Sequence, residues 1–90
     1  MENVFPISKT ITAAIEYDFY AIFGENKPAT FIRITATLAC SLQLYYDDMN
    51  SYVSIPEGLK ANAPIIIRDP VRKMKITPTA STTLAGNAMR

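Results

Sequence analysis

Hydrophobic and polar residues alternate with a period of two in several short runs of the chain. In Lys9–Phe19 the odd positions are mostly apolar and the even positions mostly polar, and Thr30–Leu38 and Ser41–Asp48 alternate in the same way. Successive side chains of a β-strand point to opposite faces, so each run predicts a half-buried strand. The pattern therefore predicts a mainly β domain with little helix.

The first of these runs has a competing interpretation. Ile11, Ile15, Phe19 and Ile22 also lie on one helical stripe, and Gly24 follows them where a helix could end. Aromatic and β-branched residues favour a strand over a helix. We therefore expect a strand here and keep a helix as the alternative for this stretch.

The middle of the chain predicts two or three more strands. The piece "TLAC" between Thr30–Leu38 and Ser41–Asp48 lacks strong turn residues, so these runs predict either a tight hairpin or one long bent strand. The following "DDMNS" has the composition of a turn. Tyr52–Ile55 then predicts a short strand, which a turn built by Pro56 and Gly58 should end.

The last third of the chain begins with an apolar run. Ile65–Ile67 predicts a short buried strand, and Pro70 should end it because proline cannot donate to a ladder. Strict alternation in "VRKMKIT" places two sets of residues on opposite faces: Arg72, Met74 and Ile76 on one, Val71, Lys73 and Lys75 on the other. The final "TTLAGNA" predicts an edge strand or a tail.

About seven short strands with closely spaced turns predict a small antiparallel β-sandwich or a partly open barrel. The chain has 90 residues, 49% of them hydrophobic and 19% charged, which is too apolar for a disordered protein. We expect one domain over residues 1–90, with 1–8 as a candidate N-terminal contact arm and 80–90 as a C-terminal edge strand or tail. A domain of this size has a modest core, which association with a partner would supplement.

Charge is distributed unevenly along the chain. Residues 1–59 contain three Lys or Arg and seven Asp or Glu, a net charge of −4, whereas residues 60–90 contain six and one, a net charge of +5. The sum is the net charge of +1 for the whole chain. This asymmetry predicts either attraction of a charged partner or pairing of the two segments within one fold.

The residue types argue against catalysis. The chain has no histidine, the commonest general base and metal ligand, and no nucleophile elbow, phosphate loop or zinc spacing. Asp47, Asp48 and Asn50 are too few and too closely spaced for a calcium loop. Cys40 is the single cysteine, which fits a reducing compartment and a small core or half-buried position. We therefore predict that the protein is not an enzyme and has no catalytic, cofactor-binding or metal-binding residues.

Contacts with other molecules are the remaining role. No apolar segment is long enough to span a membrane, and the start "MENVFPISK" does not resemble a signal peptide, so a membrane partner is not expected. Nucleic acid is not expected either, because the net charge is small and the aromatic residues concentrate away from the basic run. Nine residues are candidates for an interface: Val4, Phe5, Ile7, Arg72, Lys73, Lys75, Tyr45, Tyr46 and Tyr52. The tyrosines among them could instead form a platform for a carbohydrate.

The order of features in Thr30–Leu84 resembles a known group of proteins. "FIRITAT" and "SLQLYY" are followed by the corner "IPEG", the short strand "PIIIRD" and the closing "VRKMKITPTASTTL". This succession is similar to that of small virion structural proteins of tailed bacteriophages, the β-sandwich head decoration or cement type.

The resemblance implies a non-enzymatic subunit of a virion that is made in the host cytoplasm and contacts the major capsid protein or another virion protein. It also implies self-association, with the polar face of the "KMKITPTA" strand available to neighbouring subunits. It supplies no catalytic residues. The alternative from the residues themselves is a small β-sandwich module that binds a carbohydrate or another surface ligand.

Overall fold

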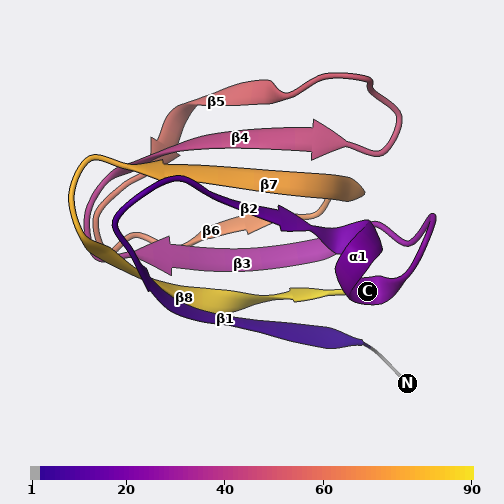
Figure 1. The fold of residues 1–90 in the computed structure, drawn as a ribbon, viewed down its shortest axis with the longest axis horizontal. Helices are drawn as coiled ribbons and strands as arrows, with labels where there is room; N and C mark the ends of the chain where they lie inside the picture. Colours follow the sequence, from indigo (N-terminus) through magenta and orange to yellow (C-terminus); the bar gives the residue numbers. More distant parts are fainter. Residues whose placement is uncertain (1–2) are drawn as a thin grey trace.

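The structure, a computed structural model, describes residues 3–90 and consists of eight strands and one short helix (Figure 1). The elements in chain order are β1 (Val4–Ile11), β2 (Ile15–Asp18), α1 (Phe19–Phe23), β3 (Phe31–Ala36), β4 (Cys40–Tyr46), β5 (Val53–Leu59), β6 (Ile65–Ile67), β7 (Val71–Pro78) and β8 (Thr82–Met89). They form two four-stranded antiparallel sheets, which confirms the predicted all-β sandwich.

The strand order shows how the chain is wound. Sheet A has the order β1-β8-β3-β6, and sheet B has the order β2-β7-β4-β5. The pairs β1·β8, β2·β7, β3·β6 and β4·β5 are all antiparallel, so the chain is one long hairpin folded over on itself. This nested pairing is the topology of a jelly roll, which divides eight strands between two sheets.

The core fills the space between the sheets with apolar side chains. Sheet A contributes among others Ile32, Ile34 and Leu84, each fully buried, and sheet B contributes Met74 and Ile76. Cys40 is buried beside them, as predicted from its type. The alternation of buried and exposed positions along β3 and β4 is therefore the pattern that the sequence predicted for these strands.

The stretch from Lys9 to Phe23 combines both interpretations. β1 ends at Ile11, the chain crosses to sheet B, and β2 runs from Ile15 to Asp18. Asp18 then caps α1, because its carboxylate accepts a hydrogen bond from the backbone N–H of Tyr20 at 3.1 Å. The prediction of a single strand was wrong, since a cap and a helix of one turn follow the second strand.

The connections between strands correct two further predictions. β3 and β4 belong to different sheets, so of the two alternatives for this stretch the hairpin is wrong, and the chain instead bends from one sheet to the other. β5 continues through Pro56 to Leu59 rather than ending at the proline. Its pairing with β4 shifts between Cys40 and Leu42, and Gly58 has a φ of 56° at this irregularity.

Three strands of sheet A, β1, β6 and β8, also differ from expectation. Ile65–Ile67 is an edge strand with Ile66 53% exposed, not a buried strand. β8, predicted as an edge strand or tail, lies between β1 and β3. The candidate N-terminal arm includes Met1 and Glu2, which lie outside the described residues, but from Val4 onward it is strand β1, whose Ile7 is only 2% exposed.

The threonine-rich end of the chain has a structural role in this arrangement. The backbone N–H of Leu38 donates to Thr82 Oγ1 at 3.0 Å, and the backbone N–H of Thr83 donates to Thr37 Oγ1 at 3.0 Å. The hydroxyls of Thr37 and Thr82 are also 3.0 Å apart. These bonds satisfy polar groups where the chain leaves β3, so they fix the bend between the sheets.

Candidate functional site

A cluster of tyrosine and basic side chains lies on the outer face of sheet B. We call Tyr20, Tyr45, Tyr52, Arg72 and Lys73 the Tyr–Arg cluster. They come from α1, from β4, from the residue before β5, and from β7. Strand pairing places Tyr45 opposite Lys73, so the two side chains share one face. Far-apart segments of the sequence therefore meet on a single surface.

A β-bulge in β7 directs Arg72 onto this surface. Tyr45 pairs with Lys73 while Tyr46 pairs with Val71, so Arg72 has no partner residue on β4. Val71 faces the core at 0% exposure, and Arg72 is half-buried. The prediction that Arg72 shares a face with Met74 and Ile76 was wrong, because the extra residue changes the phase of the strand.

The guanidinium of Arg72 stacks against two aromatic rings. Its central carbon lies 4.6 Å from the ring centre of Tyr20 and 5.5 Å from that of Tyr45. Lys73 Nζ lies 5.8 Å from the ring centre of Tyr45, and the rings of Tyr45 and Tyr52 meet edge to face with centres 5.5 Å apart. Cation–π contacts and ring pairs of this kind hold side chains in one conformation.

Carboxylates bind the hydroxyls at two ends of the cluster. The hydroxyl of Tyr20 donates to Asp47 Oδ1, and the hydroxyl of Tyr52 donates to Glu16 Oε2. Lys73 Nζ lies 4.0 Å from Glu16 Oε1, a long and exposed ion pair that contributes little stability. The cluster thus carries its own counter-charges.

These contacts change the pKa values of the two tyrosines. Burial and the hydrogen bond to Glu16 raise the pKa of Tyr52 above the ordinary value of 10.0. The hydrogen bond to Asp47 is the main cause that raises the pKa of Tyr20. Both hydroxyls therefore remain protonated donors at neutral pH, and neither is a candidate base.

A substitution at Glu16 tests this arrangement. In Glu16→Gln we expect a lower pKa for Tyr52, because the negative charge of the carboxylate is lost and the amide oxygen that remains is a weaker acceptor. Tyrosinate absorbance during an alkaline titration measures this pKa. Because the folded state holds the phenolic proton more tightly than the unfolded state, the wild-type protein should lose stability as pH rises above about 10. Asp48→Asn is the control, and an unchanged titration of Glu16→Gln would contradict the Tyr52–Glu16 bond.

The acidic and basic segments of the sequence meet within the fold. Glu16 on β2 lies opposite Lys75 on β7, and Asp18 lies opposite Lys73. The charge asymmetry noted in the sequence is therefore compensated in part by strand pairing, one of the two outcomes that it predicted.

The candidate interface residues fall at three places. Arg72, Lys73, Lys75, Tyr45 and Tyr52 belong to sheet B or its border and lie near the cluster. Val4, Phe5 and Ile7 belong to β1 in sheet A, where Ile7 is in the core. Tyr46 is half-buried and lines a groove between β5 and β6. The three tyrosines therefore do not form one surface.

Sequence reasoning missed Tyr20, Glu16 and Asp47. Tyr20 reaches the cluster because α1 begins at the residue before it, and the signal for this was Asp18 as an N-cap with Gly24 at the other end of the helix. No local signal identifies Glu16 or Asp47 as partners of tyrosines, because both contacts join segments that are distant in the sequence.

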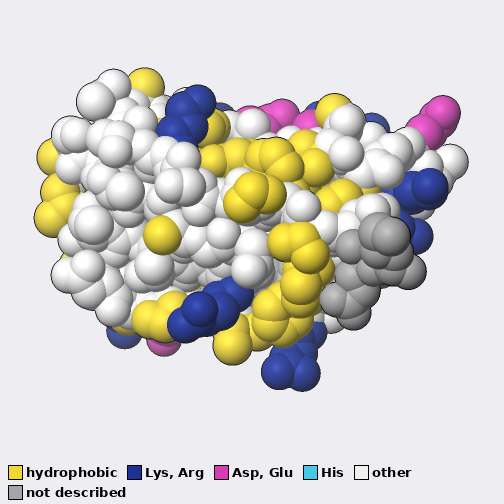
Figure 2. All heavy atoms as spheres, turned by 90° about the horizontal axis from the view of Figure 1, so that it is seen from below, with side chains coloured by type: hydrophobic (Ala, Val, Ile, Leu, Met, Phe, Trp, Pro, Cys, Tyr) yellow, Lys and Arg dark blue, Asp and Glu magenta, His cyan; other side chains and the backbone are white. Residues whose placement is uncertain are grey.

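The outer face of sheet A differs in chemistry from that of sheet B. Its strands carry the cations Lys9 and Arg33 and no carboxylate. Figure 2 shows hydrophobic side chains gathered on this side of the molecule, with Lys and Arg at the margins and Asp and Glu only along the rim. Val4 and Ile66, each 53% exposed, contribute to the apolar surface of the sheet. This side offers contact area rather than paired acids and bases.

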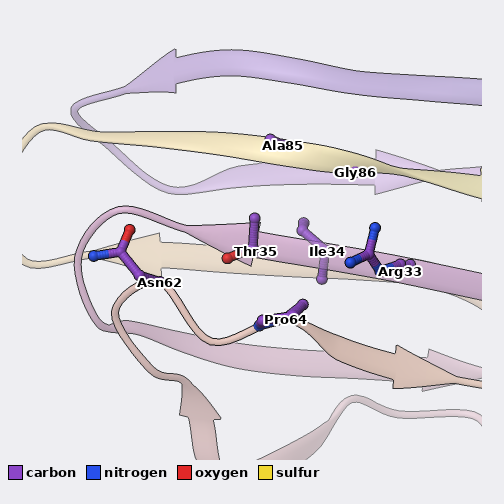
Figure 3. A pocket seen from close by; sticks show the side chains of 7 residues that line it. All are labelled: Arg33, Ile34, Thr35, Asn62, Pro64, Ala85 and Gly86. Carbon is purple, nitrogen blue, oxygen red and sulfur yellow. The ribbon is translucent and has the colours of Figure 1, made fainter.

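Two hollows on the surface are candidate ligand sites. One, of about 390 Å³, is lined by residues of β3, β8 and the loop before β6, with Arg33 and Asn62 at opposite ends (Figure 3). The other, of about 420 Å³, is the groove between β5 and β6, lined largely by isoleucine and leucine side chains. Within residues 3–90 no group of three or more His, Cys, Asp and Glu could hold a metal ion.

The described part of the chain contains no helix long and apolar enough to cross a membrane. Comparison with known family models, curated proteins and solved structures gives no match to this chain.

Proposed function

We propose that the chain is a non-enzymatic virion structural protein of a tailed bacteriophage, which decorates or cements the capsid through contacts between subunits. The observation that carries the proposal is the Tyr–Arg cluster. Tyr and Arg are enriched at the energetic centres of protein interfaces, where they supply large contact areas and ordered donors. The cluster presents three Tyr and one Arg, all half-buried and held by mutual contacts.

The fold supports this proposal at the level of analogy. Jelly rolls with eight strands occur in viral capsid domains and in lectins, but a fold alone does not determine function. The resemblance of Thr30–Leu84 to head decoration and cement proteins favours the capsid among these. The protein would accordingly be located in the virion after synthesis in the host cytoplasm, with the major capsid protein or another virion protein as its partner.

The mechanism would be burial of area across subunit boundaries. A standard interface buries roughly 800 Å² on each partner, and the described subunit exposes 5237 Å². One subunit therefore has room for several such contacts, including contacts with other copies of itself. Repetition over a symmetric shell turns individually weak contacts into strong attachment.

Charge reversal on β7 tests whether the Tyr–Arg cluster contacts the capsid. For Arg72→Glu, Lys73→Glu and Lys75→Glu combined, we expect binding to the capsid to weaken at least about tenfold at low salt. The loss should shrink as salt rises, because exposed charges are screened beyond about 8 Å at physiological ionic strength. Co-sedimentation with purified capsids measures the affinity.

The matched control makes the same change in net charge elsewhere. Lys9→Glu, Arg33→Glu and Lys60→Glu combined alter exposed residues outside the Tyr–Arg cluster. Circular dichroism must show that both variants fold, since Glu16 lies beside Lys73 and Lys75. If binding to the capsid weakened equally in the two variants, or did not weaken in the first, a contact through the Tyr–Arg cluster would be refuted.

A second function is favoured by one specific observation. Tyr45 and Tyr52 lie side by side on the solvent side of sheet B, as a carbohydrate platform requires, and Gln43 and Ser54 are paired beside them with side chains 3.4 Å apart. Binding of a glycan that Tyr52→Ala abolishes would favour this carbohydrate-binding module over the virion protein.

A further inference from the structure

The carboxylates around Arg72 already have partners. Asp47 accepts a hydrogen bond from the hydroxyl of Tyr20, Glu16 accepts one from that of Tyr52 and lies near Lys73, and Asp18 accepts one from the backbone N–H of Tyr20. Within residues 3–90, by contrast, the side chain of Arg72 makes no hydrogen bond or ion pair, and its Nε is buried without a partner. The guanidinium of this half-buried residue therefore has no anion among the described residues.

The guanidinium is also fixed in position before any partner arrives. The bulge directs the side chain outward, and the rings of Tyr20 and Tyr45 contact it. An arginine held in this way loses little conformational entropy on binding, and its planar fork matches the two oxygens of a carboxylate. We propose that Arg72 anchors the Tyr–Arg cluster to a partner protein by binding a single side-chain carboxylate of that partner.

Charge on the face selects a carboxylate over a nucleic acid. Arg72, Lys73 and Lys75 are balanced by Glu16, Asp18 and Asp47, three cations against three carboxylates on or beside sheet B. A nucleic-acid backbone needs several unopposed cations, because each phosphate along it carries a charge. A single side-chain carboxylate that reaches Arg72 between the rings avoids most of that repulsion.

The inference rests on the proposed function and names the chemistry of its contact. The test follows the Nε–Hε NMR signal of Arg72 while the end-blocked peptide acetyl-Gly-Glu-Gly-amide, which carries one carboxylate, is added, and in a second titration while oligothymidylate is added. We expect a saturable shift of this signal and of the Tyr20 and Tyr45 ring signals with the glutamate peptide only. A shift with oligothymidylate, or none with the glutamate peptide, would overturn the inference.

Two variants separate a bidentate anchor from net charge. Arg72→Lys keeps the charge but loses the planar fork, so the affinity for the glutamate peptide, measured from the ring signals, should fall about tenfold or more. Lys75→Gln removes a charge from the same strand and should change it less than about threefold. Equal losses in the two variants would overturn the bidentate role of Arg72.

The same variants distinguish this inference from the proposed function. If wild-type protein binds capsids and Arg72→Lys binds them equally well, the virion role stands and the anchor is refuted. If wild-type protein binds the glutamate peptide through Arg72 but no capsid, the anchor stands and its partner is not a capsid. Thermal unfolding confirms that each variant is folded, so a loss of binding reports the contact itself.

Discussion

Replacement of Gly86 by alanine is expected to be the most destabilising small substitution in the chain. A Cβ at this position of β8 would lie 2.0 Å from the carbonyl oxygen of Arg33 and 2.8 Å from Cα of Ile34. The φ of 152° is also one that side-chain-bearing residues rarely adopt. Strain and displaced backbone together should cost about 3 kcal/mol or more, which lowers the melting temperature by about 15 °C.

The neighbouring residue provides the control for Gly86. Ala85 is exposed on the same strand, and Ala85→Val adds volume on the solvent side, where we expect a change within about 0.5 kcal/mol. Chemical denaturation of both variants measures the free energy of unfolding. Equal stability of Gly86→Ala and wild type would mean that β8 does not pack against β3 as closely as described.

Truncation of a buried leucine should have a comparable effect. Leu84 has 0% exposure and lies on β8 between two paired strands, so Leu84→Ala leaves a cavity in the centre of the sandwich. We expect a loss of about 3–4 kcal/mol in the free energy of unfolding. That is a large part of the stability of a domain this small, which is on the order of 5–13 kcal/mol.

Leu38 allows the same chemical change at an exposed position. It is 43% exposed at the bend between the sheets, and Leu38→Ala should alter the free energy of unfolding by about 0.5 kcal/mol or less. Denaturant titrations of the two leucine variants give the comparison directly. Similar losses in both would show that Leu84 is not a core residue.

The class of fold could be predicted because period-two alternation is a local property. β3 and β4 lie where the sequence indicated, and their apolar positions face the core. The order of strands within the sheets could not be predicted in this way. Pairing of β1 with β8 joins the two ends of the chain, and no short stretch of sequence specifies such a contact.

The bulge in β7 left a signal that strict alternation overlooked. Apolar residues at Val71, Met74 and Ile76 cannot all face one side of a regular strand, whereas two adjacent polar residues, Arg72 and Lys73, suit a bulge that keeps both outside. The opposite error occurred at β5, where Pro56 indicated an end to the strand. An edge position allows proline to remain within it.

The candidate site was predictable in part for the same reason. Arg72, Lys73, Tyr45 and Tyr52 were recognisable by residue type, and the pairing of β4 with β7 brings them together. Tyr20 and its carboxylate partner Asp47 depend on how α1 packs near that sheet, which only the tertiary structure reveals.

The proposed role of this protein is that of a structural subunit of a particle. The most direct measurement is quantitative mass spectrometry of tailed-phage particles purified on a density gradient from a lysate that expresses the chain from its native genome. If the proposed role is correct, the chain remains with the particles at a fixed ratio to the major capsid protein. Recovery of the chain only at the top of the gradient, separate from assembled particles, would contradict it.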